Sequence, residues 1–386
     1  LDDEVEAKLE PQQQVIVPAP VQDDVAQVAE LIANSIRPLV IVGGDTVGLK
    51  PELVAMAESW GVSVVPSFKH QDLFPNDHAN FGGYLGYNIP RPQVDIMLEA
   101  DLIIALGTRL GDATTQGYVL PQAPEPAQPL VHIYPDAYVP GKVYETELGL
   151  ICRSNEFVQA LGVHTVPAPP AGRKEWIKRL NSHAKKLSEW SASSAPDGLD
   201  FGFVIAELQK QIADDAVIAT DAGNFGSWLH RHFMFGKDHT LLGAVAGAMG
   251  MGVPAAVAAA LRQPHRQVIC LVGDGGFMMT GNEMATAVQY ELPIKILLSN
   301  NGAYGTIRAH QEKHFPGRVS ATVLNNPDFA MMATAYGALG LTVTDSDEIG
   351  PVLQQALEHP GPALINIQSS LEHISAYTTI DRLRSS

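Results

Sequence analysis

Short apolar segments that end in glycine, aspartate or asparagine recur along this chain, and helical patterns separate them. Three of them read RPLVIVGGD (37–45), QVICLVGD (267–274) and IKILLSNN (294–301). Apolar runs of this length are typical of strands that are buried on both faces of a parallel sheet. Because parallel strands need a crossover connection, usually a helix, the alternation predicts β-helix-β units and an α/β protein.

These units form two groups, which are separated by the proline-rich segment VPAPPAG. We therefore predict an α/β fold with two doubly wound parallel-sheet domains, at residues 15–165 and 201–386, the first of them Rossmann-like. Residues 166–200, which include the charged helical pattern RKEWIKRLNSHAKKLSEW, are predicted to be a linker. Residues 1–14 are predicted to be a tail or linker.

Charge and hydropathy exclude two classes of partner. The chain carries 42 acidic and 25 basic residues, a formal net charge of −17, and an acidic surface repels nucleic acid. Leu241–Leu261 is long enough for a membrane span and has no charge, but it is mostly Gly and Ala and contains Pro254. We interpret it as a buried loop followed by a helix, so no membrane contact is expected.

The two cysteines indicate the compartment of the protein, and the N-terminus bears on the extent of the chain. Cys152 and Cys270 lie in apolar contexts and are expected to be buried thiols in a reducing compartment, which favours the cytoplasm. The chain begins at Leu1 without a basic region followed by an apolar core, so no secretory signal is recognisable. We expect the chain to be part of a longer protein.

Asp274 and Asn301 follow two successive buried strands. Because the carboxyl ends of neighbouring parallel strands meet at one edge of the sheet, we expect both side chains to lie there. Their oxygens are the hard ligands that Mg²⁺ or Ca²⁺ prefers, and water and phosphate oxygens would complete the coordination. The alternative is that Asp274 is only a turn residue.

Glycines surround Asp274 in VGDGGFMMTG. Gly273, Gly275 and Gly276 would allow a ligand close to the backbone and leave N–H groups free for an anion. The spacing of Thr280 and Glu283 predicts a capping box for the following helix, which would make Glu283 a cap and not an acid catalyst. The residues alone therefore predict a site for a metal and a diphosphate.

Other chemistries find less support in the sequence. His310 and His314 in HQEKH have zinc-like spacing, but Gln311 stands where a zinc protease needs glutamate. No Gly-x-Ser-x-Gly elbow of a serine hydrolase is present. VGGDTVGLK fits neither the P-loop nor the dinucleotide-binding pattern, which argues against an NAD-dependent oxidoreductase.

The segment GDGGFMMTGNEMATAVQYELPIKILLSNN resembles the signature of the thiamine-diphosphate-dependent enzymes, in which Gly-Asp-Gly precedes Asn-Asn. GAVAGAMGMGVPAA is similar to the family's loop under the cofactor's pyrimidine, and DAGNFGSW to its first diphosphate loop. Residues 15–165 resemble the family's central domain, and 201–386 its diphosphate-binding domain. The greatest likeness is to the acetolactate synthase-like group.

This resemblance implies roles for individual residues. Asp274, Asn301 and the backbone carbonyl of Ala303 would bind Mg²⁺. Met249 would lie under thiamine diphosphate and enforce its bent form, and Gly247 would accept a hydrogen bond from its amino group. The diphosphate would be held by backbone groups of two glycine-containing segments, namely Gly223, Asn224, Phe225, Gly273, Gly275 and Gly276.

The enzymes of this family also need a pyrimidine-binding domain, which carries the glutamate that activates the cofactor. No segment of this chain resembles that domain, so the catalytic residue is not identified, and we expect the chain alone to be inactive. The missing domain would lie elsewhere in the full-length chain or on a partner chain. Because the family's sites form between subunits, a homodimer or homotetramer is expected.

Two departures from acetolactate synthases concern the substrate and a second cofactor. His310 occupies the position of the tryptophan that selects the acceptor keto acid in those enzymes. Leu110, Gly111, Asp112 and Ala113 replace their flavin-contacting Phe-Asp-Asp-Arg pattern, which argues against FAD. Ile307, Arg308 and His310 follow the metal-binding segment and are the candidates for contact with the substrate.

The resemblance implies cleavage or ligation of a C–C bond in a 2-keto acid or a related acyl donor, with thiamine diphosphate and Mg²⁺. Simple decarboxylation of a 2-keto acid or an acyl-CoA is the alternative within the family. A non-catalytic nucleotide-binding subunit is the alternative outside it, since the activating glutamate is missing.

Overall fold

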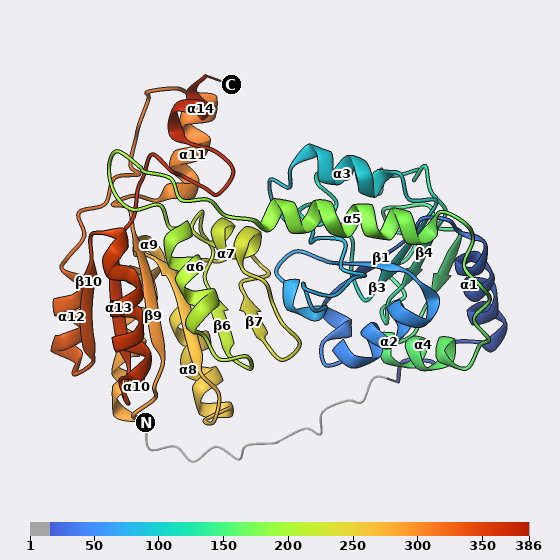
Figure 1. Ribbon diagram of the computed structural model, residues 1–386, viewed down its shortest axis with the longest axis horizontal. Coiled ribbons are helices and arrows are strands. Elements are labelled where there is room, and N and C mark those ends of the chain that lie inside the picture. Colours follow the sequence, from blue (N-terminus) through green and yellow to red (C-terminus); the bar gives the residue numbers. More distant parts are fainter. Residues whose placement is uncertain (1–15, 386) are drawn as a thin grey trace, which may run out of the picture.

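The computed structural model describes residues 16–385, and the predicted tail or linker at 1–14 lies outside them. Two separate sheets, each with all strands parallel and helices around it, lie side by side (Figure 1). The predicted fold class is therefore confirmed. We call the part of the chain around the first sheet the first unit and the part around the other the second unit.

The first unit has a five-stranded sheet in the order β2-β1-β3-β4-β5. Its strands are β1 (Pro38–Val42), β2 (Ser63–Pro66), β3 (Leu102–Leu106), β4 (Leu130–Ile133) and β5 (Leu148–Leu150). Its helices are α1 (Gln22–Asn34), α2 (Lys50–Trp60), α3 (Arg91–Leu98), α4 (Ser154–Gly162) and α5 (Arg173–Ser188), with short 3₁₀ turns η1 (Gly44–Thr46) and η2 (Gln71–Leu73).

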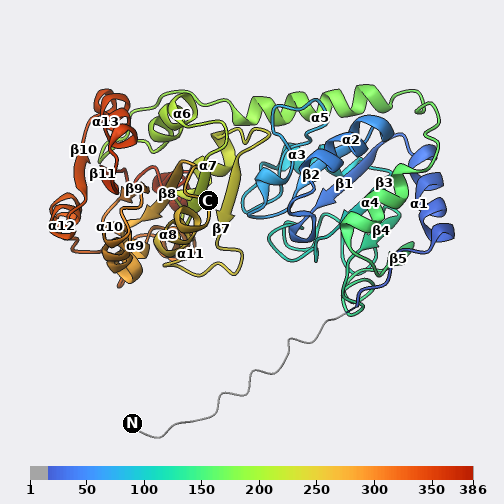
Figure 2. The same cartoon turned by 90° about the horizontal axis from the view of Figure 1, so that it is seen from below.

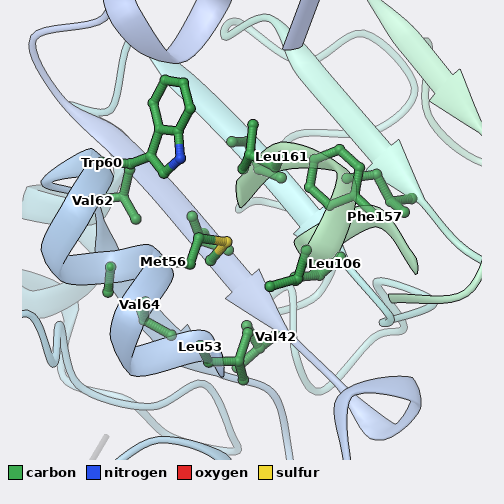
Figure 3. Packing of buried hydrophobic residues seen from close by; sticks show 14 of the residues in the cluster. Val42, Leu53, Met56, Trp60, Val62, Val64, Leu106, Phe157 and Leu161 are labelled. Atoms are coloured by element: carbon green, nitrogen blue, oxygen red, sulfur yellow. The ribbon is translucent and has the colours of Figure 1, made fainter. Parts of the chain in front are cut away.

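The first sheet is covered on both faces because its side chains alternate between two cores. Val40 and Val42 of β1 pack with α2 and α4, in the cluster that Figure 3 shows around Met56 and Phe157. Leu39 and Ile41, which point to the other face, pack with α3 and α5. Because both faces of the sheet are buried, such a strand is apolar at every position.

Helix α5 is the charged helix of the segment 166–200. It packs on the first sheet, beside α3 (Figure 1), and runs along the upper edge of the first unit in Figure 2. Arg173 at its start is 2% exposed and donates hydrogen bonds to carbonyls at the ends of two helices, among them Trp60 O of α2 at 2.9 Å and Ala33 O of α1 at 3.1 Å. One guanidinium therefore caps the unpaired carbonyl groups of α1 and α2.

The second unit has a six-stranded sheet in the order β10-β11-β9-β8-β6-β7. Its strands are β6 (Val217–Thr220), β7 (Thr240–Gly243), β8 (Val268–Gly273), β9 (Lys295–Asn300), β10 (Leu339–Val343) and β11 (Ala363–Gln368). Its helices are α6 (Gly202–Gln211), α7 (Gly226–His232), α8 (Gly252–Arg262), α9 (Asp274–Thr280), α10 (Met284–Gln289), α11 (Gly305–His314), α12 (Phe329–Tyr336), α13 (Ser346–Glu358) and α14 (Ile380–Arg384), with the 3₁₀ turn η3 (Gly281–Glu283).

The membrane-like segment Leu241–Leu261 divides into the end of β7, a turn at 244–250 and most of α8. Ala256 and Ala260 of α8 pack on β8, which explains why the segment is apolar without being a span. Within residues 16–385 no helix combines the length and the hydropathy that crossing a bilayer requires. Cys152 and Cys270 are both free and buried, as predicted.

The two units are in direct contact through backbone and buried polar groups. Asn76 of the first unit donates its backbone N–H to Phe235 O at 2.8 Å, and its side chain accepts from the N–H of Phe235 at 3.0 Å. The N–H of Leu241, on β7, donates to Asp72 Oδ2 at 3.0 Å. The segment after β2 thereby lies against the edge strand β7 of the second sheet.

Candidate functional site

The carboxyl ends of β6 and β8 form a point at which the chain direction across the second sheet reverses. From β6 the chain goes to β7 on one side, and it then returns to β8 on the other side of β6. Phe225, after β6, packs into the core on one face, whereas Phe277, after β8, packs into the core on the opposite face. Ligands of open α/β sheets bind in the crevice between such diverging segments.

Asp274 lies at this point, at the first position of α9, and it is 3% exposed. Its Oδ1 accepts from the N–H of Gly275, and its Oδ2 accepts from the N–H of Gly302 and from Asn326 Nδ2, all at 2.8 Å. Burial raises the pKa of Asp274, and these hydrogen bonds oppose the shift. A buried carboxylate of this kind gains from a bound cation.

The segment Asn301–Ala303 folds around the same carboxylate. The N–H of Ala303 donates to Asn301 Oδ1 at 3.1 Å, and it also lowers the pKa of Asp274, so the two predicted ligand side chains share one amide neighbour. Gly302 has φ +67°, a left-handed conformation that favours glycine and turns its N–H toward Asp274. One carboxylate with amide and carbonyl oxygens fits Mg²⁺, which keeps water and phosphate oxygens as its other ligands.

Asn326 is part of this arrangement, although no role was predicted for it. Its Nδ2 donates to Asp274 Oδ2 and to Asn300 Oδ1, both at 2.8 Å, and thereby links the ends of β8 and β9. Asn300 in turn donates to Asn366 Oδ1 of β11 at 3.0 Å. The first asparagine of the Asn-Asn pair is therefore held within the sheet, while the second, Asn301, belongs to the loop.

The glycines beside Asp274 are closely surrounded by other site segments. A methyl group on Gly275 would lie 2.6 Å from the Tyr304 ring and 3.3 Å from Met249 Cε. One on Gly276 would lie 2.3 Å from Asp221 Oδ2, and one on Gly273 would lie 3.2 Å from the Phe225 ring. Contacts shorter than van der Waals distance exclude any side chain at Gly275 and Gly276.

The loop after β6 contains the predicted residues Gly223, Asn224 and Phe225. Asn224 donates to Ile374 O at 2.7 Å and lies against Gly305, the first residue of α11, where a methyl group would meet its Oδ1 at 2.3 Å. Phe225 is buried, whereas Gly223 is exposed. The loop therefore lies between the Asp274 segment and the start of α11. We call residues 222–225 the diphosphate loop, after the role that the resemblance implies for them.

The turn at 244–250 contains Gly247 and Met249. Gly247 has φ +72° and is exposed together with the residues from Val245 to Ala248. Met249 is half-buried, with its Cε close to Gly275. The structure thus brings Met249 to the glycines of α9 and leaves the tip of the turn open to solvent.

Asp221, the first residue of DAGNFGSW, connects these segments, although no role was predicted for it. It is fully buried at the end of β6 and accepts from the N–H groups of Ala222 at 2.8 Å, Gly250 at 2.9 Å and Met251 at 3.2 Å. It also lies directly against Gly276. One carboxylate therefore positions the diphosphate loop, the turn that carries Met249 and the start of α9.

The predicted capping box of Thr280 and Glu283 is wrong. Thr280 stands directly before the 3₁₀ turn η3, but its side chain caps no N–H of the turn, and Thr280 Oγ1 donates instead to Gly250 O at 2.7 Å. Glu283 accepts from Thr286 Oγ1 at 3.0 Å. Thr280 therefore serves to hold the turn that carries Met249.

The candidates for contact with the substrate lie on α11. Ile307 is 51% exposed and His310 is also exposed, whereas Arg308 is largely buried. Arg308 Nε donates to Glu312 Oε1 at 2.8 Å, and Glu312 also accepts from Arg384 of α14 and from the N–H of Gly317. Helices α11 and α14 lie together on the second unit (Figure 1).

Glu312→Gln should release α14 from α11. The two arginines hold the pKa of Glu312 at about 2, well below its usual 4.5, so its stabilisation is complete above pH 4.5 and disappears as the pH falls toward 2. Removing one member of a buried ion pair costs about 3 kcal/mol at neutral pH. Urea unfolding at pH 7, 4 and 3 should show that loss at pH 7 and a smaller difference at pH 3.

The matched control is Glu207→Gln, because Glu207 forms an i,i+3 pair with Lys210 whose lysine is mostly exposed. An exposed pair contributes only about 0.5 kcal/mol. Equal losses from the two variants, or a loss from Glu312→Gln that does not shrink at low pH, would show that the cluster is not a buried ionic link.

A cavity of about 530 Å³ opens at the carboxyl ends of β9 and β11. Its lining includes Asn300, Asn301, Gly302 and Asn326. Both residues of the Asn-Asn pair therefore lie in the wall of this cavity.

His310 and His314 do not form a metal site with acidic or thiol groups. Their rings are stacked with centroids 6.3 Å apart. Across residues 16–385 no three His, Cys, Asp or Glu side chains gather in a metal-binding cluster. A metal at Asp274 would accordingly rely on neutral oxygen ligands.

Comparison with known proteins matches both units to one family. Residues 25–161 match the model "Thiamine pyrophosphate enzyme, central domain", and residues 221–367 match "Thiamine pyrophosphate enzyme, C-terminal TPP binding domain". The second match includes the diphosphate loop, Met249, Asp274 and Asn301.

Curated relatives align over most of the chain. The Bacillus subtilis protein named "Putative thiamine pyrophosphate-containing protein YdaP" is 31% identical over 94% of this chain and 60% of its own length. The acetolactate synthase large subunit of Corynebacterium glutamicum is 31% identical over 89% of this chain and 56% of its own. Sulfoacetaldehyde acetyltransferase of Castellaniella defragrans is 28% identical over 86% and 59%. The chain thus spans well under two thirds of the length of these relatives.

Proposed function

The chain belongs to the thiamine-diphosphate-dependent, acetolactate synthase-like enzyme family, and from this premise we propose that its second unit binds thiamine diphosphate together with Mg²⁺. The observation that carries the proposal is the arrangement of Asp274 and Asn301 around the Ala303 amide, beside two glycines that have no room for a side chain.

The residues of the chain would bind and orient the cofactor. Asp274, Asn301 and the Ala303 carbonyl would hold Mg²⁺, and the N–H groups of the diphosphate loop and of Gly275 and Gly276 would hold the diphosphate. Met249, which lies against Gly275, would support the cofactor from below. When bound, the cofactor supplies stabilisation of a carbanion, and the protein supplies orientation and electrostatics.

The proposed reaction is cleavage or ligation of a C–C bond in a 2-keto acid or a related acyl donor. It is supported by relatives named as an acetolactate synthase and a sulfoacetaldehyde acetyltransferase. Ile307 and His310, exposed on α11 directly after the metal-binding segment, would face the substrate. Simple decarboxylation remains the alternative reaction, because His310 replaces the tryptophan of acetolactate synthases.

The site would be completed by a pyrimidine-binding domain, supplied by the full-length chain or by a partner chain in a homodimer or homotetramer. This proposal is supported by the exposure of Val245–Ala248, the tip of the turn that resembles the family's pyrimidine loop. Val245, Met278 and Met279 are about half exposed near the site. Such apolar surface is typical of a contact with another domain or chain.

Thermal unfolding with a panel of ligands tests this function. Thiamine diphosphate with Mg²⁺ at 100 times its dissociation constant should stabilise the chain by about 2.7 kcal/mol, and ADP with Mg²⁺ or FAD should not. Stabilisation by ADP alone would favour a non-catalytic nucleotide-binding subunit. Measuring which 2-keto acids release CO₂ with the full-length protein then identifies the acyl donor.

A further inference from the structure

We propose that Lys69, a residue of the first unit, supplies positive charge to the diphosphate loop of the second unit and helps to hold the ligand's diphosphate group. The inference rests on the proposed function, since it adds one residue to the same site. The ligand class is an organic diphosphate.

Lys69 has an unusual position for a lysine. It is 5% exposed, although lysine is almost never buried without a partner. Its φ of +64° is left-handed, a conformation that is strained for a residue other than glycine. Strain of this kind is kept where the surrounding structure imposes it, and here it turns the side chain out of the first unit.

The side chain crosses to the carboxyl ends of β6 and β7. A methyl group on Gly243, the last residue of β7, would lie 3.0 Å from Lys69 Cβ and Cδ, so the aliphatic stem packs on the end of that strand. A methyl group on Gly226, which follows the diphosphate loop, would lie 4.0 Å from Lys69 Nζ. The ammonium group therefore lies beside the loop that would bind the diphosphate.

No residue within 16–385 accepts a hydrogen bond from this ammonium group. Its nearest ring contact is Phe68, with Nζ 5.5 Å from the ring centroid. Burial lowers the pKa of Lys69 to about 8, and the negative charge of Asp221 opposes the shift. A largely buried cation without an acceptor in the protein is destabilising, so an anion on the diphosphate loop would supply the hydrogen bonds that the ammonium group lacks.

The charged groups that face Lys69 come from two elements of the second unit. Asp221, at the end of β6, is already bound by three backbone N–H groups. His230, on α7, has a pKa that burial and the charge of Lys69 lower, so it is neutral and adds no counter-charge. Neither group accepts a hydrogen bond from Lys69, so a bound anion would be its first hydrogen-bonding partner.

Calorimetry with thiamine diphosphate, inorganic diphosphate and thiamine, each with Mg²⁺, tests the role of Lys69. Lys69→Met keeps the length of the side chain and removes its charge, while Lys69→Arg keeps the charge. Lys50→Met is the matched control: Lys50 also joins the units, with Nζ 2.9 Å from His239 O, but this contact lies at the start of β7, away from the diphosphate loop.

Lys69→Met should weaken the binding of thiamine diphosphate and of inorganic diphosphate about tenfold, because hydrogen bonds to charged groups are worth that much. Binding of thiamine, which has no diphosphate, should not change. Lys69→Arg should retain most of the affinity, and Lys50→Met should bind like the wild type. Equal affinities of Lys69→Met and Lys50→Met for both diphosphates would overturn the assignment.

The pH dependence separates a charge effect from a purely structural one. Diphosphate affinity of the wild type should fall as the pH rises above about 8, as the free ammonium group loses its proton. Lys69→Arg should remove that fall over the same range, and Lys69→Met should show a flat profile. If the wild type bound no diphosphate ligand, the proposed function itself would be contradicted. If the pH profiles of both Lys69 variants matched that of the wild type, only the role of Lys69 would be contradicted.

Discussion

Asp274→Asn should abolish Mg²⁺-dependent binding of thiamine diphosphate, with a loss of at least a hundredfold in affinity, and leave the fold intact. The carboxylate is the one charged group among the proposed metal ligands, and removal of a metal ligand's charge removes most of the attraction for a hard cation. Calorimetric titration with thiamine diphosphate, in Mg²⁺ and in EDTA, measures the effect.

The stability of this variant is the second part of the prediction. Burial raises the pKa of Asp274, so at neutral pH the folded protein holds a charge that it disfavours. A neutral asparagine removes that penalty and loses some hydrogen bonding. These two effects oppose each other, so the free energy of unfolding without ligand should fall by less than it does for Asp221→Asn.

Asp200→Asn is the matched control for Asp274→Asn. Asp200 is also a buried aspartate of the second unit, and it accepts from the N–H of Gly202 at 2.8 Å and from Trp228 Nε1 at 2.9 Å, away from the glycines of α9. This variant should have a lower free energy of unfolding, but once folded it should bind thiamine diphosphate as tightly as the wild type. If Asp274→Asn bound the cofactor as tightly as the wild type, Asp274 would not be a metal ligand.

Asp221→Asn should reduce both stability and cofactor affinity. An asparagine has one acceptor oxygen and presents an N–H₂ group to amides that are themselves donors, so at least one of the N–H groups of Ala222, Gly250 and Met251 loses its partner. A buried donor without a partner costs about 1–3 kcal/mol. Displacement of the turn that carries Met249 should weaken thiamine diphosphate binding at least tenfold.

Gly276→Ala offers a specific check on the position of Asp221. Its methyl group would lie 2.3 Å from Asp221 Oδ2, so this variant should also be destabilised. Asp221→Ser should relieve that collision, and the double variant should be more stable than the sum of the two single losses predicts. Additive losses in denaturant unfolding would mean that the two residues are not in contact.

That Asp274 and Asn301 lie close together was predictable, because the signal is local. Asp274 and Asn301 each follow an apolar strand, and neighbouring parallel strands bring such positions together whatever the rest of the fold. The glycines could be predicted for the same reason, since they stand beside Asp274 in the sequence. Residues 37–42 and 267–273 were recognisable as strands because parallel sheets bury both of their faces.

The residues that support the site were not predictable, because their partners are distant in the sequence. Asn326 meets Asp274 across 52 residues, and Asp221 meets Gly250 across 29. Lys69 comes from the other unit altogether. The capping-box prediction failed for a related reason, since Thr280 forms its hydrogen bond with Gly250 and not with its own helix.

The position of the metal ion tests most directly whether Asp274 and Asn301 bind it. Crystals grown with thiamine diphosphate and Mn²⁺ in place of Mg²⁺ allow the ion to be located by its anomalous scattering. We predict one anomalous peak, between the side chains of Asp274 and Asn301 and the Ala303 carbonyl. The diphosphate should lie between the diphosphate loop and Gly275. A peak elsewhere, for example at His310 and His314, or a cofactor bound without contact to Asp274, would contradict it.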